Sequence, residues 1–499
     1  MSKFNKQTIK NSLIPVLTVF PQIFGAFVVT KLMLDELGAD MVGLFAIVGV
    51  LMGFGGLLTF GAGDATLRLV AKYRALNDHE KLGKVIRCSS LIFLLAGFVA
   101  ALFLYVGKDL LISLLDSEDA GKSIDRDFAS KVFSLVGLGL LFFLPASGFK
   151  AVIDGFERLD LTGIIHTIFS TLEVSLQFTL LYLGYGLISV VTLMVVARTL
   201  LCVTLFIVTC RLLNGRYRMS PAWDGLIFKE AIDFGIYLWL GSIFNRLWNQ
   251  GLPLIVGAII GLEAVGIYTV AMKPILMLIV VIDKTTMFLF PYLTGVFEKK
   301  QKDVLFLRYE QVTCVAVMTG AAFCGSLVFL ARPFVEFWLE EKATETIVMI
   351  IQILAIRFAV HPASMVASHF MRASKKTKSL LAIQIISSIT LMIATVIGAY
   401  TGGLLGVALG QFAVFGLVMF NRSLVEKQLF AIFRPALQLR IILGAAIPSA
   451  LMWLVASTSQ ELTFLNLAGG FLAFLACATI PFLILRSQAN LIREAVLIS

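Results

Sequence analysis

Apolar residues run through this chain in long blocks that short polar or basic connections separate. Each block is about twenty residues long, which is the length that an α-helix needs to cross the roughly 30 Å hydrocarbon core of a bilayer. The pattern predicts fourteen membrane-spanning helices, at Asn11–Met33, Met41–Ala62, Cys88–Val106, Ala129–Gly148, Leu161–Leu183, Leu187–Cys210, Ile232–Gly257, Val265–Tyr292, Gln311–Ala331, Ile347–Phe370, Ser379–Tyr400, Leu405–Asn421, Ile441–Ala456 and Leu465–Leu485. The predicted fold class is therefore an all-α polytopic membrane protein.

Lysine and arginine are distributed unequally between the two sides that these helices define. If the N-terminus is cytoplasmic, the connections on that side hold about 29 of them and the opposite side about seven. Arg422 and Lys427 are counted here with the cytoplasmic connection that follows the twelfth helix. The excess predicts that both termini are cytoplasmic, and it indicates contact with anionic lipid headgroups.

A weak internal repeat divides the chain. Gly38-Ala39-Asp40-Met41-Val42-Gly43 lies between helices 1 and 2, and Gly261-Leu262-Glu263-Ala264-Val265-Gly266 lies between helices 7 and 8. Gly184-Tyr185-Gly186 and Gly402-Gly403 form a second echo at the corresponding later turns. Six helices per copy give both copies the same orientation in the membrane. We predict a six-helix lobe at 1–218, a second at 219–430, and two additional helices with a cytoplasmic tail at 431–499.

One cytoplasmic connection, from Gly63 to Arg87, is amphipathic and basic. We interpret it as a helix that lies on the membrane surface rather than as a binding element.

Composition excludes several classes of function. Of the 499 residues, 59% are hydrophobic and only 14% are charged, whereas a soluble domain has about 25% charged residues. The net charge of +10 follows the topology, so nucleic acid is not expected as a partner. The chain has no Walker loop and no cysteine or histidine spacing typical of a metal site. These absences favour secondary or passive transport over enzymatic activity, without a cofactor.

Among the cations inside predicted helices, three lack an obvious carboxylate neighbour in sequence, and each costs about 2.5–3.5 kcal/mol even on the insertion scale. They are Arg246 in helix 7, Lys273 in helix 8 and Arg357 in helix 10. Asn249 and Gln250 share a helical face with Arg246. Because guanidinium and ammonium groups bind phosphate through charge-assisted hydrogen bonds, we predict that these five residues line a substrate path for an anionic ligand.

Other polar residues within the helices allow two interpretations. Arg198 and Glu173, on neighbouring helices, could form a structural ion pair, or Glu173 could be a proton-coupling site. His361 could be a satisfied interior histidine or part of a proton relay. Pro362, beside it, is expected to kink helix 10. The coupling ion, a proton or sodium, stays open.

Several motifs resemble the polysaccharide-exporter branch of the multidrug/oligosaccharidyl-lipid/polysaccharide (MOP) superfamily. They are the two glycine turns at Gly38 and Gly261, the segment Phe290-Pro291-Tyr292-Leu293-Thr294, and the segment Gly155-Phe156-Glu157-Arg158-Leu159-Asp160. The pattern covers nearly the whole chain. The chain resembles Wzx-type flippases of the bacterial cytoplasmic membrane, which move undecaprenyl-pyrophosphate-linked oligosaccharide. The resemblance implies two lobes of the MATE type, a central cavity and alternating access. Many relatives carry an acidic residue late in helix 7, where this chain has Asn249-Gln250-Gly251.

This resemblance implies a polyprenyl-pyrophosphate-linked glycan and membrane lipids as partners, with a polysaccharide polymerase and a chain-length regulator to be considered. Three alternatives stay open: a multidrug or cation antiporter of the same superfamily, a flippase for a peptidoglycan-precursor lipid, and a membrane scaffold or membrane-embedded transferase. The antiporter would need carboxylates in its cavity, and helix 1 has none.

Overall fold

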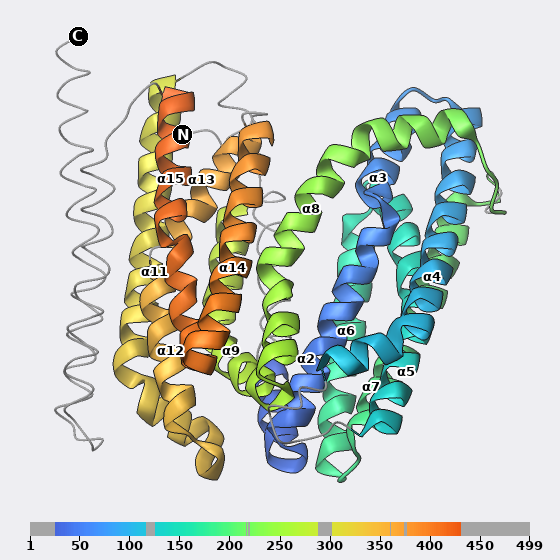
Figure 1. Cartoon of the computed structure of the whole chain (residues 1–499). Helices are drawn as coiled ribbons and strands as arrows, with labels where there is room; N and C mark the ends of the chain where they lie inside the picture. Colours follow the sequence, from blue (N-terminus) through green and yellow to red (C-terminus); the bar gives the residue numbers. More distant parts are fainter. Residues whose placement is uncertain are drawn as a thin grey trace, which may run out of the picture. The chain divides into compact units, whose positions relative to one another are not determined.

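The structure, a computed structural model, describes residues 25–115, 125–215, 217, 220–287, 302–359, 361–373 and 377–430 (Figure 1). Within these ranges eight helices are long and apolar enough to cross a membrane, or nine if one bent pair counts as a span. The prediction of an all-α, multi-pass membrane protein is confirmed. The total of fourteen helices stays a prediction, because most of helix 1 and all of helices 13 and 14 lie outside the described residues.

The chain separates into two compact units, and the division falls between Gly266 and Ile267. The helix predicted to open the second lobe, α8 (Gly225–Ile259), packs against α2, α3 and α4 of the N-terminal unit. The predicted lobes at 1–218 and 219–430 therefore stay a sequence-based prediction, and 431–499 lies outside the described residues.

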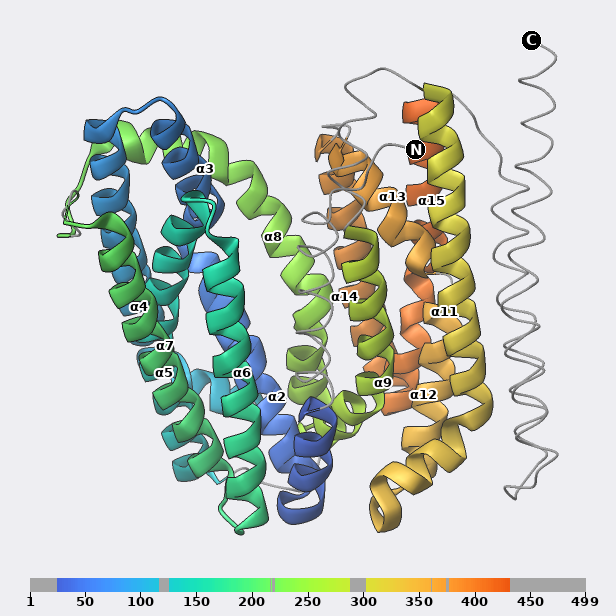
Figure 2. The same ribbon diagram turned by 180° about the vertical axis from the view of Figure 1, so that it is seen from behind.

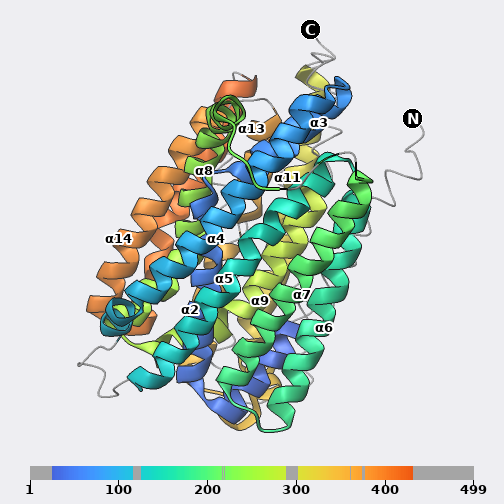
Figure 3. The ribbon, with the colours of Figure 1, turned by 90° about the vertical axis from the view of Figure 1, so that its right-hand side faces the viewer.

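In the N-terminal unit, helices pack both with their neighbours in sequence and with helices further along the chain. After a helical segment at 25–37, the elements of this unit are α2 (Ala39–Gly55), the 3-10 turn η1 (Gly56–Thr59), α3 (Ala62–Ala75), α4 (His79–Leu115), α5 (Arg126–Gly155), α6 (Leu159–Tyr182), α7 (Leu187–Leu213) and α8. The most extensive packing joins α4 to α5 and α5 to α7, and these helices run side by side in Figures 1 and 3. The core where α5 meets α7 is built from Ala146, Ile153, Leu201 and Leu205.

In the C-terminal unit α11 packs against α12 and α13, and α13 packs in turn against α15 (Figure 2). The described elements of this unit are most of α9 (Leu262–Met287), then α11 (Lys302–Leu339), η3 (Glu340–Lys342), α12 (Glu345–Phe358), α13 (His361–Ala373), α14 (Thr377–Gly410), η4 (Gln411–Val414), α15 (Phe415–Val425) and the π-helical turn η5 (Glu426–Phe430). A kink at Gly402 and Gly403 divides α14, where the sequence predicted the turn between helices 11 and 12.

The repeated glycine motif forms a tight contact within the N-terminal unit. Gly38 and Gly261 begin the two copies with positive φ values of 85° and 115°, a conformation that glycine adopts without steric cost. Five residues later, Gly43 of α2 lies against the backbone of Gly266, in the first turns of α9. A Cβ at Gly43 would overlap the carbonyl oxygen of Leu262, and one at Gly266 would overlap that of Ala39. The two copies therefore pack on each other through equivalent positions.

The kink expected at Pro362 is present, since predicted helix 10 is divided into α12 and α13, which meet at an angle of 44° just before this proline. Arg422, counted above with a cytoplasmic connection, is completely buried in α15, and its Nε donates to Glu426 Oε1 at 3.0 Å. A carboxylate one turn later compensates this buried charge, and simple charge counting does not detect such a pair.

The amphipathic connection forms α3, whose apolar face packs inside the unit. Leu69, Val70 and Tyr73 join a core with residues of α4, α5 and α8. On the adjoining face, Glu230 of α8 accepts hydrogen bonds from Lys72 Nζ and Tyr73 OH, each at 2.6 Å. Burial raises the pKa of Glu230, but the hydrogen bonds from Lys72 and Tyr73 outweigh it and hold that pKa below its usual value. The interpretation as a helix that only covers the membrane surface is therefore incomplete.

Replacing Gly43 by alanine should destabilise the protein by about 1–3 kcal/mol, because the added methyl group meets backbone that cannot move aside. Gly49→Ala is the matched control, since it lies in the same helix and has open space around its Cβ position. That variant should be neutral or up to ~1 kcal/mol more stable. Thermal unfolding of the purified protein in detergent measures both. Equal unfolding temperatures for the two variants would contradict the tight contact.

Acid should weaken the contact between α3 and α8. A carboxylate whose pKa is lowered by folding contributes stability above its unfolded pKa, and that contribution is lost as the pH falls through the folded pKa. Glu230→Gln should therefore lower Tm by about 1–2 °C at pH 7 and leave it unchanged at the acid end of a pH series. Tyr73→Phe should move the acid transition to higher pH. A deficit of Glu230→Gln that is constant at every pH would contradict this.

Candidate functional site

Arg246 lies in α8, half-buried against the end of α2. Its Nη1 donates to the backbone carbonyl of Gly53. Its Nη2 lies 2.9 Å from the position that a Cβ on Gly56 would occupy. A glycine at position 56 thus makes room for the guanidinium. One backbone carbonyl satisfies only part of a group with five N–H donors, so Arg246 is held in place while it can still bind an anion.

Gln250, one turn beyond Arg246, packs on the same glycine. A Cβ at Gly53 would overlap its side-chain oxygen. This oxygen is buried and has no hydrogen-bond partner among the described residues. A buried acceptor without a partner costs about 1–3 kcal/mol, which a ligand hydroxyl or a water molecule could recover. Asn249 lies in α8 between these two, and its side chain lies outside the described residues.

Lys273 lies in α9, in the C-terminal unit, and is half-buried. Its ammonium makes no hydrogen bond or ion pair with any residue that the structure describes. Pro274 follows directly. A proline inside a helix removes the N–H that would bond the carbonyl four residues before it, so the backbone near Lys273 also has an incomplete hydrogen-bond ladder.

Arg357 and His361 stand on either side of the break between α12 and α13. Arg357 is only 1% exposed. It lies in the last turn of α12, where the helix dipole favours a cation. Its Nε donates to the carbonyl of Gln411 at 3.5 Å, and the guanidinium lies 4.0 Å from the centre of the Phe358 ring. His361 packs edge-on against the same ring at 5.3 Å.

Prolines accompany all of these cations: Pro253 follows Arg246 by two turns, Pro274 adjoins Lys273, and Pro362 follows Arg357. Weakened helices at membrane depth are tolerated where they are buried in protein or line a polar cavity.

Glu173 of α6 and Arg198 of α7 form an ion pair, with 3.5 Å between Oε2 and Nη2. Both side chains are largely covered, at 12% and 27% exposure. Arg198 also lies 5.6 Å from the centre of the Phe143 ring. A pair of this kind neutralises two charges in helices long enough to span the bilayer.

The structure brings together Arg246 with Gln250, Glu173 with Arg198, and Arg357 with His361. Lys273 and Arg357 belong to the C-terminal unit and Arg246 to the N-terminal unit, so each group is described by itself. Among the described residues, no three His, Cys, Asp or Glu side chains are grouped to hold a metal ion. Sequence reasoning missed the role of Gly53, because a glycine gives no sign of what will approach it.

Solved structures with the same fold include "Lipid II flippase MurJ, inward closed conformation". It has a TM-score of 0.72 and 17% identity, covering 94% of this chain and 98% of that one. An inward-facing multidrug resistance MATE family transporter of the MOP superfamily has a TM-score of 0.70 and 15% identity, covering 82% and 95%. At these identities the likeness establishes the fold, which is MATE-like as predicted.

Two family models match the sequence itself. The model described as "Polysaccharide biosynthesis protein" matches residues 156–303, and the MatE model matches residues 16–179. A protein of Shigella flexneri named "Putative O-antigen transporter" is 20% identical over 348 residues, which are 68% of this chain and 79% of that protein. Each family model covers about a third of the chain. The matches agree with the resemblance to the MOP superfamily, with a multi-pass membrane transporter or flippase and with the prediction that the chain is not an enzyme.

The structure explains the motif after α5. Gly155–Asp160 forms the turn into α6, where Glu157 adopts a positive φ of 62° and Arg74 of α3 pairs with it at 3.4 Å. Arg158 pairs with Asp160 at 3.1 Å. The motif therefore orders a turn and carries no evident ligand chemistry.

Gln250→Leu separates a structural from a functional role of its side chain. Leucine removes a buried oxygen without a partner while filling similar space, so Tm should stay unchanged or rise. If the oxygen serves the transported ligand, transport should fall at least threefold. Thermal unfolding and a transport assay on the same preparation measure the two effects. A Tm several degrees lower, with transport intact, would show that the side chain is structural.

Proposed function

We propose that this protein is a flippase that moves undecaprenyl-pyrophosphate-linked oligosaccharide, an O-antigen or exopolysaccharide repeat unit, across the bacterial cytoplasmic membrane by alternating access. The observation that carries the proposal is the cationic character of helices that should be apolar. Lys273 has no counter-ion among the described residues, and Arg246 is bound to a backbone carbonyl rather than to a carboxylate. Cations that have no carboxylate partner among the described residues suit an anionic ligand.

The proposed division of roles follows the chemistry of each side chain. Arg246 and Lys273 bind the pyrophosphate, while Gln250 and Asn249 hydrogen-bond to adjoining sugar or phosphate oxygens. Arg357, which is fully buried in this state, belongs to this set only if its surroundings open during transport. The polyprenyl tail stays in the lipid. The named relatives support this reading, because one carries an O-antigen transporter's name and another is a lipid II flippase.

The ion pair of Glu173 and Arg198 is the proposed place for coupling, and its alternative role is structural neutralisation. His361 is the second titratable group that could take part in coupling, as part of a proton relay. Protons and sodium ions both remain candidates for the coupling ion. A cytoplasmic location of both termini, and partnership with a polymerase and a chain-length regulator, belong to the same proposal.

A multidrug antiporter and a flippase for peptidoglycan precursors have the same fold. The matches of the MatE model and the lipid II flippase structure favour them as alternatives. A drug-resistance profile of a deletion strain tests the first. Competition between undecaprenyl-linked glycan and lipid II in one liposome assay tests the second.

Arg246→Ala and Lys273→Ala should each lower surface glycan about 10–100-fold, since a hydrogen bond to a charged group contributes about 1.5–3 kcal/mol. Arg246→Lys and Lys273→Arg keep the charge and should retain part of the activity. Lys342→Ala, on the exposed turn η3, is the control and should export normally. Glycan is quantified per molecule of protein in the membrane. Normal export by both alanine variants would exclude the phosphate-binding role.

A further inference from the structure

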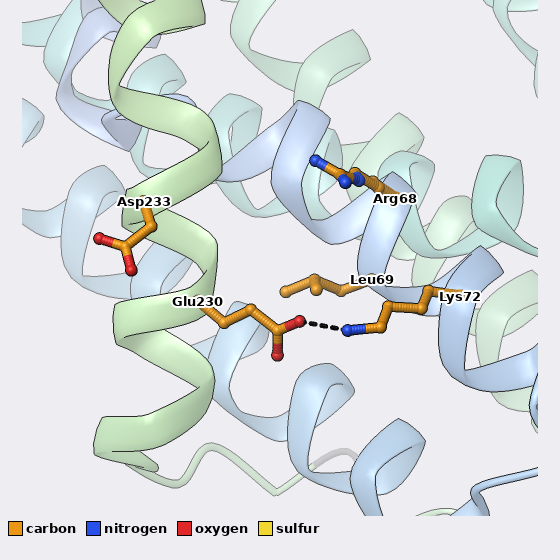
Figure 4. A pocket seen from close by; sticks show the side chains of 5 residues that line it. All are labelled: Arg68, Leu69, Lys72, Glu230 and Asp233. Atoms are coloured by element: carbon orange, nitrogen blue, oxygen red, sulfur yellow. Dashed lines mark hydrogen bonds and ion pairs between the residues drawn. The ribbon is translucent and has the colours of Figure 1, made fainter.

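A pocket of about 320 Å³ lies between α3 and α8, and its walls carry opposite charges. Figure 4 shows Arg68, Leu69 and Lys72 on the α3 side and Glu230 and Asp233 on the α8 side. Arg68 and Lys72 are one helical turn apart, as are Glu230 and Asp233. The pocket is therefore cationic on one wall and acidic on the other, with no net charge.

We propose that this pocket binds the headgroup of a zwitterionic aminophospholipid such as phosphatidylethanolamine. The phosphate faces Arg68 and Lys72, and the ammonium faces Glu230 and Asp233. In the structure Lys72 and Glu230 pair with each other at 2.6 Å across the pocket. Both stay partly exposed, at 45% and 35%, so a ligand with the same two charges can exchange with this contact.

The balance of charges selects the class of headgroup. An anionic headgroup would meet two carboxylates, and a simple cation would meet two basic side chains. A primary ammonium supplies three N–H donors to carboxylate oxygens, as lysine does. A choline headgroup lacks these donors and is usually recognised by aromatic faces, whereas none of the five lining residues is aromatic.

Exposed apolar residues beside the pocket indicate a lipid rather than a soluble molecule. Leu226, one turn before Glu230 on the same face of α8, is 81% exposed, and the preceding Trp223 is 57% exposed. Tryptophan is enriched where membrane proteins meet the headgroup region. Leu226 and Trp223 would thus contact acyl chains while the headgroup enters the pocket. This inference is independent of the transported substrate.

The full-length protein, purified in detergent, is equilibrated with equal amounts of phosphatidylethanolamine, phosphatidylglycerol and phosphatidylcholine with matched acyl chains. Bound lipid is then counted by native mass spectrometry. We expect at least threefold preference for phosphatidylethanolamine. Asp233→Asn and Arg68→Gln should each abolish that preference. Glu80→Gln is the matched control, because Glu80 forms a Lys–Glu pair with Lys84, also at 2.6 Å, away from the pocket lining, and it should keep the preference.

The exchange of Lys72→Glu with Glu230→Lys in one protein separates binding from folding. It preserves an ion pair between α3 and α8 but mixes the charges on each wall. We expect a Tm within about 2 °C of that of the parent protein, because the ion pair is kept while the hydrogen bond from Tyr73 to Glu230 is lost, and a lost preference for phosphatidylethanolamine. Retention of that preference by the exchanged protein, or equal binding of phosphatidylglycerol by the parent protein, would overturn the proposal. Displacement of the lipid by free phosphoethanolamine at equal concentration would overturn the assignment to a membrane lipid.

Discussion

Within a bilayer, each polar or charged group must find its partner inside the protein, and this constraint governs both units. The fully buried Arg422 is paired with Glu426 one turn away, and Arg198 is paired with Glu173 on the neighbouring helix. Arg246 binds the backbone carbonyl of Gly53, and Gly56 leaves room for its guanidinium. The backbones also pack closely, because Gly43 and Gly266 let the first turns of α2 and α9 meet without side chains between them.

The departures from this rule point to function. Lys273 and the side-chain oxygen of Gln250 lack partners among the described residues, and both lie close to prolines that interrupt the helical hydrogen bonds. A protein that only needed to be stable would replace such groups by apolar ones. A transporter of a lipid-linked anion needs cations that are already positioned. In the pocket between α3 and α8, Lys72 and Glu230 are paired but stay partly exposed. A ligand that carries both charges could therefore exchange with this pair.

Much of the fold could be predicted from the sequence because hydrophobic length and glycine turns are local signals. The spans, the turn at Gly402 and Gly403, and the likeness of the Gly38 and Gly261 turns depend on neighbouring residues only. The contacts between residues that are distant in sequence could not be predicted. Nothing in the sequence shows that α8 packs with the N-terminal unit, that Gly53 contacts both Arg246 and Gln250, or that the buried Arg357 donates to the carbonyl of Gln411. The i, i+4 spacing of Arg422 and Glu426 was a readable signal that charge counting overlooked.

The central claim is that the cations inside the membrane serve translocation of a polyprenyl-pyrophosphate-linked glycan. The most direct measurement reconstitutes the purified protein in liposomes with such a glycolipid, labelled on its sugar, and follows its accessibility to an enzyme outside the vesicles. The account predicts that the protein equilibrates the labelled lipid between leaflets without altering it chemically. Glycolipid that stays in its original leaflet, in vesicles shown to contain correctly folded protein, would contradict the account.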